Sequence, residues 1–346
     1  MEQPANLFEQ QASNRRRSFW LVTGFVLFFA WVGFGGDIAW YLMSTGPGME
    51  ARSDYAPHTV PWIGIIATLI AGAVCWYSWK KGAERVLWAT GAREILEPAT
   101  DGERRLVNVV EEMAIASGLP KPRIFVVPDA DPNAFATGIE PTKACIAVTE
   151  GLIGTLSREE LQGVVAHEMA HVQNFDTRLM TLLAAMVGAI ALMSDGMGRM
   201  LRFGSFGGGS SSRSGGRSND KGGNPLALVI LVLWVITLIL APIISRFLAM
   251  AVSRKREYLA DATGAQFTRN PMALASALEK LDAAGEPTHT ITKGAAHLCI
   301  VDPSASQLSR KEGFLGDVFS SHPPIRMRIA RLRGMAYQQV KLESAG

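Results

Sequence analysis

Three long runs of uncharged, mostly apolar residues constrain this chain more than any other feature. They cover residues 18–36, 59–79 and 222–245 and contain 19, 21 and 24 residues. An α-helix rises about 1.5 Å per residue, so each run is long enough to cross the ~30 Å hydrocarbon core of a membrane. Aromatic residues gather at the ends of the second run, as in the aromatic belts of membrane proteins. We therefore predict three membrane-spanning helices.

A fourth apolar run, residues 179–194, is shorter than the other three. It holds 16 residues between Arg178 and Asp195. This length fits either a short span or a buried core helix. Counted as a span, it pairs with residues 222–245 in a second hairpin, and the chain then has about four membrane helices.

The positive-inside rule sets the expected orientation. Three arginines at residues 15–17 precede the first run, and Lys80 and Lys81 follow the second. Both ends of this hairpin are therefore expected in the cytoplasm. The cations of residues 198–223 oppose this scheme, but both halves of the site described below must share one compartment. A cleaved secretory signal is the alternative for the first run, although no clear cleavage site follows it.

Composition excludes several other classes of protein. Hydrophobic residues make up 48% of the chain and charged residues 19%, below the roughly 25% typical of soluble globules. A net charge of +3 is too small for this length to indicate a nucleic-acid partner. Three distant cysteines without a CxxC pair predict neither a disulfide framework nor a cysteine metal site. Residues 204–223 are mainly glycine and serine, which is typical of a flexible linker.

The part outside the apolar runs has an α+β pattern and is mostly helical. Apolar residues recur at helical spacing over residues 103–117, and Gly118 and Pro120 end that helix. Residues 123–127 and 144–149 are short apolar strands, and residues 133–138 form a third strand at the sheet edge. A capping box, with serine three residues before glutamate, begins a helix at residue 157.

That helix carries the strongest chemical signal in the chain, the HExxH motif of His167, Glu168 and His171. Histidines four residues apart share a helix face and can bind one zinc ion. Glu168 lies beside the open position of such a metal and can act as a general base. The alternative is two surface histidines, but the apolar turn before the motif indicates a buried helix, where this cluster would be costly without a metal.

A catalytic zinc site of this kind needs a third protein ligand. The HxxGxxH continuation is excluded, because Asn174 and Thr177 occupy its glycine and histidine positions. The next glutamate after Glu168 is Glu257, four residues before Asp261 on an expected helix. Glu257 could bind zinc, and Asp261 could accept the free ring N–H of a zinc-bound histidine. Considered without the HExxH motif, Glu257 and Asp261 could instead lie on an exposed helix face and form surface salt bridges with Arg254 and Arg256.

Several motifs in this order resemble one family. HEMAH at 167–171, SRKREYLAD at 253–261, SHPP at 321–324 and NAFATG at 133–138 are similar to the HtpX-type membrane zinc metalloproteases, relatives of the CAAX prenyl protease. The resemblance covers residues 80–332. The linker at 204–223 and the tail before the first span depart from the family pattern, but neither contains an expected ligand.

The resemblance implies a role for each matching residue. His167, His171 and Glu257 would hold one zinc ion per chain, and Glu168 would be the general base and acid. His322 and Arg328 would stabilise the oxyanion, although His322 could instead cap the helix that follows. The strand that pairs with the substrate backbone would consist of Asn133, Ala134, Phe135, Ala136, Thr137 and Gly138.

These inferences divide the chain into four parts. Residues 1–79 form a tail and a membrane hairpin, and residues 179–249 form the second hairpin. Residues 80–178 and 250–346 form a gluzincin-type protease domain at the cytoplasmic face of a bacterial inner membrane. The resemblance implies hydrolysis of membrane or misfolded proteins in quality control, with proteins or peptides as substrates. The lipid bilayer is a further expected partner, and no nucleic-acid partner is expected. A specific processing protease and a non-catalytic zinc-binding scaffold are the alternatives.

Overall fold

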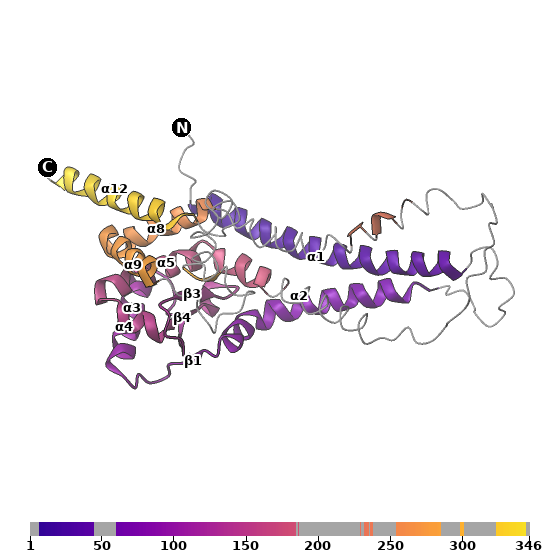
Figure 1. Cartoon of the computed structure of the whole chain (residues 1–346), viewed down its shortest axis with the longest axis horizontal. Coiled ribbons are helices and arrows are strands. Elements are labelled where there is room, and N and C mark those ends of the chain that lie inside the picture. Colours follow the sequence, from indigo (N-terminus) through magenta and orange to yellow (C-terminus); the bar gives the residue numbers. More distant parts are fainter. Residues whose placement is uncertain are drawn as a thin grey trace. The chain divides into compact units, whose positions relative to one another are not determined.

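A computed structural model of the chain describes residues 7–44, 60–184, 186, 229, 232–234, 236–237, 254–284, 298–300 and 323–343. The described residues are mostly helical and include one small sheet (Figure 1). The chain forms two compact units. The first consists of Met1–Trp20, Tyr77–Ala185 and Phe247–Gly346, and the second of Leu21–Trp76 and Met186–Arg246. Most of the expected span at 222–245 and the whole linker at 204–223 lie outside the described residues.

The first two apolar runs form long helices, α1 (Leu7–Ser44) and α2 (Trp62–Ala89). Within the described part of the chain, Gln11–Ile38 and Trp62–Ala89 are long and apolar enough to cross a membrane. Only 22% of the most apolar window of each helix is buried, whereas the core helix of a soluble protein would be mostly buried. Leu27 and Leu69 illustrate this, with exposed fractions of 63% and 68%. Both helices therefore present the apolar surface that a lipid environment requires.

The fourth run is described only in part. Residues 176–184 are helical. Leu179, Met180 and Leu182 are buried. The described part of this run is therefore a buried helix, and the rest of the run lies outside the described residues.

The sheet contains four strands in the order β1-β2-β4-β3. Its strands are β1 (Arg93–Glu94), β2 (Arg123–Val127), β3 (Ala134–Thr137) and β4 (Cys145–Thr149). β2 and β4 are parallel, while β1 and β3 are antiparallel to their neighbours. The three expected strands are present, and β3 lies at the edge of the sheet, as predicted. β1 was not expected.

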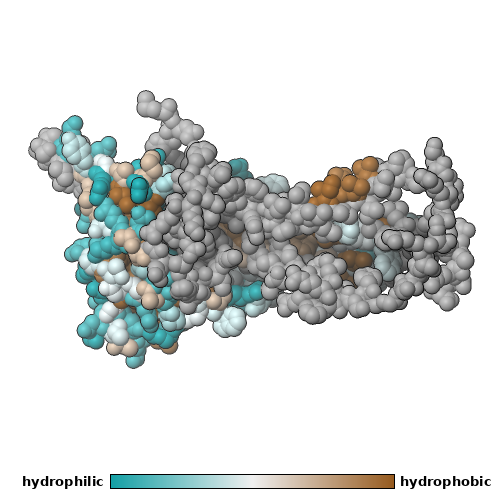
Figure 2. Space-filling view, viewed as in Figure 1, coloured by the Kyte–Doolittle hydropathy of each residue, from teal (hydrophilic) through white to brown (hydrophobic). Residues whose placement is uncertain are grey.

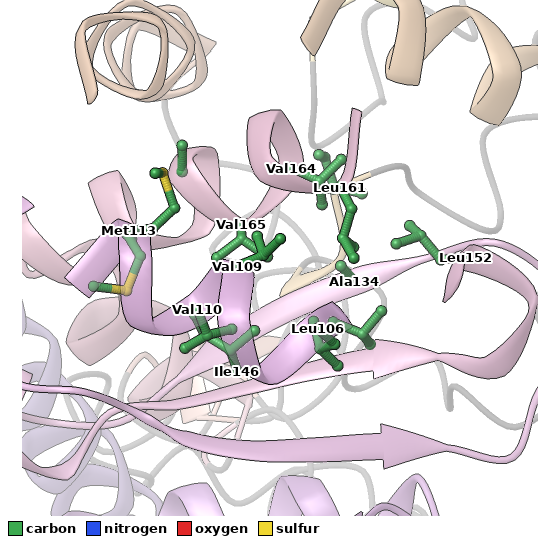
Figure 3. Packing of buried hydrophobic residues seen from close by; sticks show 14 of the residues in the cluster. Leu106, Val109, Val110, Met113, Ala134, Ile146, Leu152, Leu161, Val164 and Val165 are labelled. Atoms are coloured by element: carbon green, nitrogen blue, oxygen red, sulfur yellow. The ribbon is translucent and has the colours of Figure 1, made fainter. Parts of the chain in front are cut away.

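Two of the helices that form the hydrophobic core, α3 (Asp101–Ser117) and α5 (Arg158–Gln173), pack on one face of this sheet (Figure 3). α3 buries the apolar stripe seen in its sequence, including Leu106, Val109 and Val110. α5 buries Leu161, Val164 and Val165 against the same core. Because the helix that carries the HExxH motif is packed into the core, its motif side chains lie inside the protein rather than on its surface.

Side-chain caps fix where α5 begins. The predicted capping box is present: Glu160 N–H donates to the Ser157 side chain, and the Glu160 carboxylate accepts from Ser157 N–H. The same carboxylate accepts hydrogen bonds from Ser276 and Lys280 of α9 (Pro271–Ala284). These hydrogen bonds connect the start of α5 to a helix that lies more than a hundred residues later in the chain.

α8 (Arg254–Thr268) packs closely against α5. A Cβ atom at Gly264 would lie 3.0 Å from the backbone nitrogen of His167, so this approach depends on glycine. The remaining elements of the first unit are α4 (Glu150–Thr155), the short 3-10 helix Pro141–Lys143 and α12 (Ile325–Glu343). In Figure 2, hydrophilic side chains cover most of the described surface over α3, α4 and α9.

Candidate metal centre

Three side chains from two helices converge inside the first unit. His167 and His171 come from α5 and Glu257 from α8, and all three are buried. The Nε2 atoms of the two histidines are 3.1 Å apart. Glu257 Oε2 lies 3.7 Å from His167 Nε2, and its Oε1 lies 3.5 Å from His171 Nε2. The spacing of four residues within α5 and the packing of α8 on α5 together produce this cluster.

These separations fit a metal ion. Zinc binds nitrogen and oxygen ligands at about 2.0–2.2 Å, so neighbouring ligands in a tetrahedral site are about 3.3 Å apart. The three separations in this cluster lie close to that value. Two imidazoles and one carboxylate are also the donor set of known catalytic zinc sites that leave a fourth position open. The residues present therefore fit the group that the motif implies.

Each of the two histidines is oriented by a carboxylate that lies against Nδ1, the ring nitrogen that faces away from the cluster. His167 Nδ1 lies 2.9 Å from Asp261 Oδ1, and His171 Nδ1 lies 3.0 Å from Asp176 Oδ2. A carboxylate only accepts hydrogen bonds, so in the neutral form of each ring, the form that binds a metal, Nδ1 carries the proton and the Nε2 lone pair faces the cluster. Asp261, the residue that the sequence suggests for this role, lies against the ring of His167.

Asp176 is the residue that sequence reasoning missed. It is the first acidic residue after Glu168 in the chain, and it is completely buried. Its position five residues after His171 could have marked it as a candidate. However, α5 ends at Gln173 and a turn follows at Asn174 and Phe175. The helical spacing of α5 therefore does not predict the direction of the Asp176 side chain.

Burial and charge shift the acid–base behaviour of the cluster. Burial raises the pKa of Glu168 to about 7, and the nearby Glu257 carboxylate adds to this effect. Burial alone would lower the pKa of His171. The hydrogen bond to Asp176 and the charge of Glu257 outweigh burial and raise this pKa to about 9. Burial lowers the pKa of His167 to about 4, although Asp261 opposes the shift. These values describe the cluster without a metal ion.

Arg328 of α12 lies in the same cluster and is completely buried. Its guanidinium donates two hydrogen bonds to Asp261 and one to the backbone oxygen of Ile300. Its Nη1 also lies 3.4 Å from Glu257 Oε2. The expected partner in oxyanion stabilisation, His322, lies outside the described residues.

The expected substrate strand lies beside the motif helix. β3 packs against α5, and the Ala136 N–H donates a hydrogen bond to the Glu168 carboxylate. Asn133 is tied to Thr149 by backbone and side-chain hydrogen bonds before the strand begins. At the other end, Thr137 and Gly138 both hydrogen-bond to the Thr181 hydroxyl.

The outer edge of β3 is not wholly unpaired, contrary to the expectation from sequence. Phe135 forms an antiparallel bridge with Cys299, and Ile300 N–H donates to the Ala134 oxygen at 2.9 Å. The sequence gives no signal for this pairing, because it joins segments more than 160 residues apart and involves an isolated bridge rather than a periodic strand.

Together, a buried histidine–histidine–glutamate cluster, an adjacent glutamate and an edge strand define a metallopeptidase. The model of peptidase family M48 matches residues 101–336, more than half of the chain. The chain belongs to this family, and it is a membrane metalloprotease.

Proteins named as HtpX protease homologues match almost the whole chain. The homologue from Streptococcus gordonii is 37% identical over 331 residues, which cover 95% of this chain and 100% of the relative. The one from Listeria monocytogenes serotype 4a is 38% identical over 333 residues, with the same coverage. The one from Dictyoglomus turgidum is 40% identical over 282 residues, 82% of this chain and 85% of the relative. The resemblance to HtpX-type metalloproteases is thereby confirmed.

Among solved structures, the chain matches S. mikatae Ste24p with a TM-score of 0.41 and 19% sequence identity. The match covers 78% of this chain and 64% of that structure.

Proposed function

We propose that this chain is a zinc-dependent endopeptidase of the bacterial inner membrane that cuts membrane or misfolded proteins at the cytoplasmic face. One observation carries the proposal: two imidazole nitrogens and a carboxylate, 3.1–3.7 Å apart, lie next to a buried glutamate. Quality control of membrane proteins is the role that fits such a site on an anchored chain. The cations at residues 15–17 and 80–81, on either side of the first hairpin, support the cytoplasmic orientation.

His167, His171 and Glu257 would hold the ion, with Asp261 and Asp176 orienting the two imidazoles. When bound, zinc supplies Lewis acidity, which acidifies water and polarises a carbonyl oxygen. The protein provides the remaining chemistry through its own side chains, the first of which is Glu168.

Glu168 would act as general base and then as general acid. Its pKa of about 7 lies close to neutral pH, where a carboxylate can both remove a proton and return it. It would take the proton of the attacking water and deliver it to the leaving amine. The hydrogen bond from Ala136 N–H would hold the carboxylate beside β3.

β3 would align the substrate by pairing with its backbone. Alternate residues of a strand direct their backbone groups to the same edge. The Ala134 oxygen faces the outer edge, where it meets Ile300, so the Ala136 oxygen faces that edge as well. A substrate strand that pairs at Ala136 would place a peptide bond next to Glu168. His322 and Arg328 would stabilise the oxyanion, and Arg328 would also hold Asp261.

Cleavage of unfolded casein by the detergent-solubilised full chain tests this proposal. We expect Glu168→Gln to lower the rate by about 10²-fold or more while zinc stays bound, because only the proton transfer is lost. Glu159→Gln, an exposed glutamate in the first turn of α5, is the matched control and should cleave at the wild-type rate. A Glu168→Gln enzyme with wild-type activity, or cleavage that survives full removal of zinc by a chelator, would contradict the proposal.

A further inference from the structure

The carboxylate of Asp176 is held by a residue from the far end of the chain. Asn14 of α1 donates a hydrogen bond from Nδ2 to Asp176 Oδ1 at 2.6 Å and also lies 2.9 Å from the Asn174 oxygen. Asn14 is completely buried, although it comes just before the first apolar run. Residues 1–20 belong to the same compact unit as the metal centre, so this contact lies within one unit.

The other oxygen of the same carboxylate reaches the metal centre. Asp176 Oδ2 accepts the hydrogen bond of His171 Nδ1 at 3.0 Å. Arg256, the neighbour of Glu257 in α8, places its Nη1 atom 3.5 Å from Asp176 Oδ1. Asp176 therefore joins three elements: α1 through Asn14, α5 through His171 and α8 through Arg256.

The turn that carries Asp176 has an uncommon backbone conformation. Phe175 has a φ of 58°, a left-handed value that costs free energy for a bulky side chain and persists only where surrounding contacts impose it. α1 provides such contacts. Gln11 donates to the Gln173 oxygen at 2.9 Å, and the Arg15 guanidinium lies 4.4 Å from the centre of the Phe175 ring.

We propose that residues 11–15 of α1 are a positioning element of the metal centre, in which Asn14 fixes Asp176 and thereby the ring orientation of His171. This inference rests on the proposed zinc function. A ligand imidazole that is held in place loses less freedom when it binds a metal, so the partner of its free nitrogen affects affinity. Without Asn14, the Asp176 carboxylate can turn away from His171 and the ring can rotate. In this proposal, α1 contributes to the metal site and also attaches the chain to the membrane.

Zinc affinity measured by chelator competition on the full-length, detergent-solubilised protein tests the proposal. Removing an outer partner of a metal ligand typically costs 10–100-fold in affinity. We expect the dissociation constant for zinc to rise about tenfold in Asn14→Leu, which lacks the donor but has a similar size. Ser18→Ala is the matched control: Ser18 is buried one turn later in α1, and within the described part of the chain its hydroxyl donates to the Asn14 backbone oxygen and does not contact Asp176. It should stay within about twofold of wild type.

A double-mutant cycle distinguishes this route from general damage to the fold. In an Asp176→Ala background, Asn14→Leu should cause no further loss of zinc affinity, because alanine has no acceptor for either Asn14 or His171 and the connection is already broken. The visible spectrum of the cobalt(II)-loaded protein should change in the same way in both single variants. If Asn14→Leu does not yield folded protein, Asn14→Asp, which removes the donor and places a second carboxylate against Asp176, takes its place in the cycle.

The outcomes separate this inference from the proposed function. If wild type does not bind zinc, the proposed function fails, and the inference fails with it. If wild type binds zinc and Asn14→Leu binds it equally well with an unchanged cobalt spectrum, only the inference is wrong. Additive losses in the double variant would also overturn it, since they would mean that Asn14 acts through a route other than Asp176.

Discussion

Arg328 and Asp261 form a buried bidentate ion pair, although they are 67 positions apart in the chain. Arg328 Nε lies 2.9 Å from one carboxylate oxygen of Asp261, and Nη2 lies 2.7 Å from the other. The same carboxylate accepts the hydrogen bond of His167 Nδ1. Burial would raise the pKa of Asp261, but the charge of Arg328 outweighs burial and lowers it to about 2. The pair therefore keeps the partner of His167 ionised.

Replacing Arg328 should destabilise the fold strongly. Arg328→Leu leaves Asp261 buried without its counter-charge, and breaking a buried pair from one side costs about 3–5 kcal/mol. Arg333→Leu is the matched control, because Arg333 lies in α12 like Arg328 but forms an exposed pair with Glu279 of α9. Exposed pairs contribute about 1 kcal/mol or less. The free energy of unfolding of both variants in detergent checks the prediction. Equal losses would show that the Arg328 pair contributes no more than a surface contact.

Gly264 should control the distance between the two helices that carry the ligands. A Cβ atom there would lie 3.0 and 3.1 Å from backbone atoms of His167. This close contact can be relieved only if α8 moves away from α5. Gly264→Ala should therefore displace Glu257 and weaken zinc binding by about tenfold or more, in the range seen when ligand support is lost.

Gly334→Ala in α12 is the control for this substitution, since a Cβ atom at Gly334 meets nothing within 4 Å. Alanine is the better helix former by about 1 kcal/mol, so this variant should keep its zinc affinity and gain slightly in stability. Chelator competition and thermal unfolding measure the two effects. Wild-type zinc affinity in Gly264→Ala would contradict the argument from helix packing.

Zinc loading should depend on pH through His171. Its pKa in the metal-free protein is raised to about 9, so the imidazole carries a proton at neutral pH that zinc must displace. Affinity is then greatest above pH 9 and falls about tenfold per unit as pH decreases below that value. Titration of metal-free protein between pH 7 and 9, corrected for proton binding by the competing chelator, tests this. A dissociation constant independent of pH over that interval would show that His171 is already neutral.

Local patterns in the sequence predicted much of the fold and of the candidate site. Helical spacing places His167 next to His171 and Glu257 next to Asp261, because these relationships lie within one helix each. The ends of the membrane helices were less predictable. Residues 18–36 lie within the much longer α1, because a helix does not end where its sequence becomes charged.

The rest of the site depends on contacts that no local pattern encodes. Asn14 and Asp176 are 162 positions apart, and their hydrogen bond exists only because α1 packs on the turn after α5. The bridge between Phe135 and Cys299 likewise joins distant segments, and β1 has only two residues, too few to show a strand period. Such features follow from how the elements pack and not from residue spacing.

The zinc content per chain of four purified proteins tests the central claim most directly. Wild type and Glu168→Gln should each hold about one zinc ion, because Glu168 is not a ligand, while Glu257→Gln should hold far less. Glu279→Gln, an exposed glutamate of α9, should match wild type. A full zinc ion in Glu257→Gln would mean that this carboxylate is not the third ligand and would contradict the account.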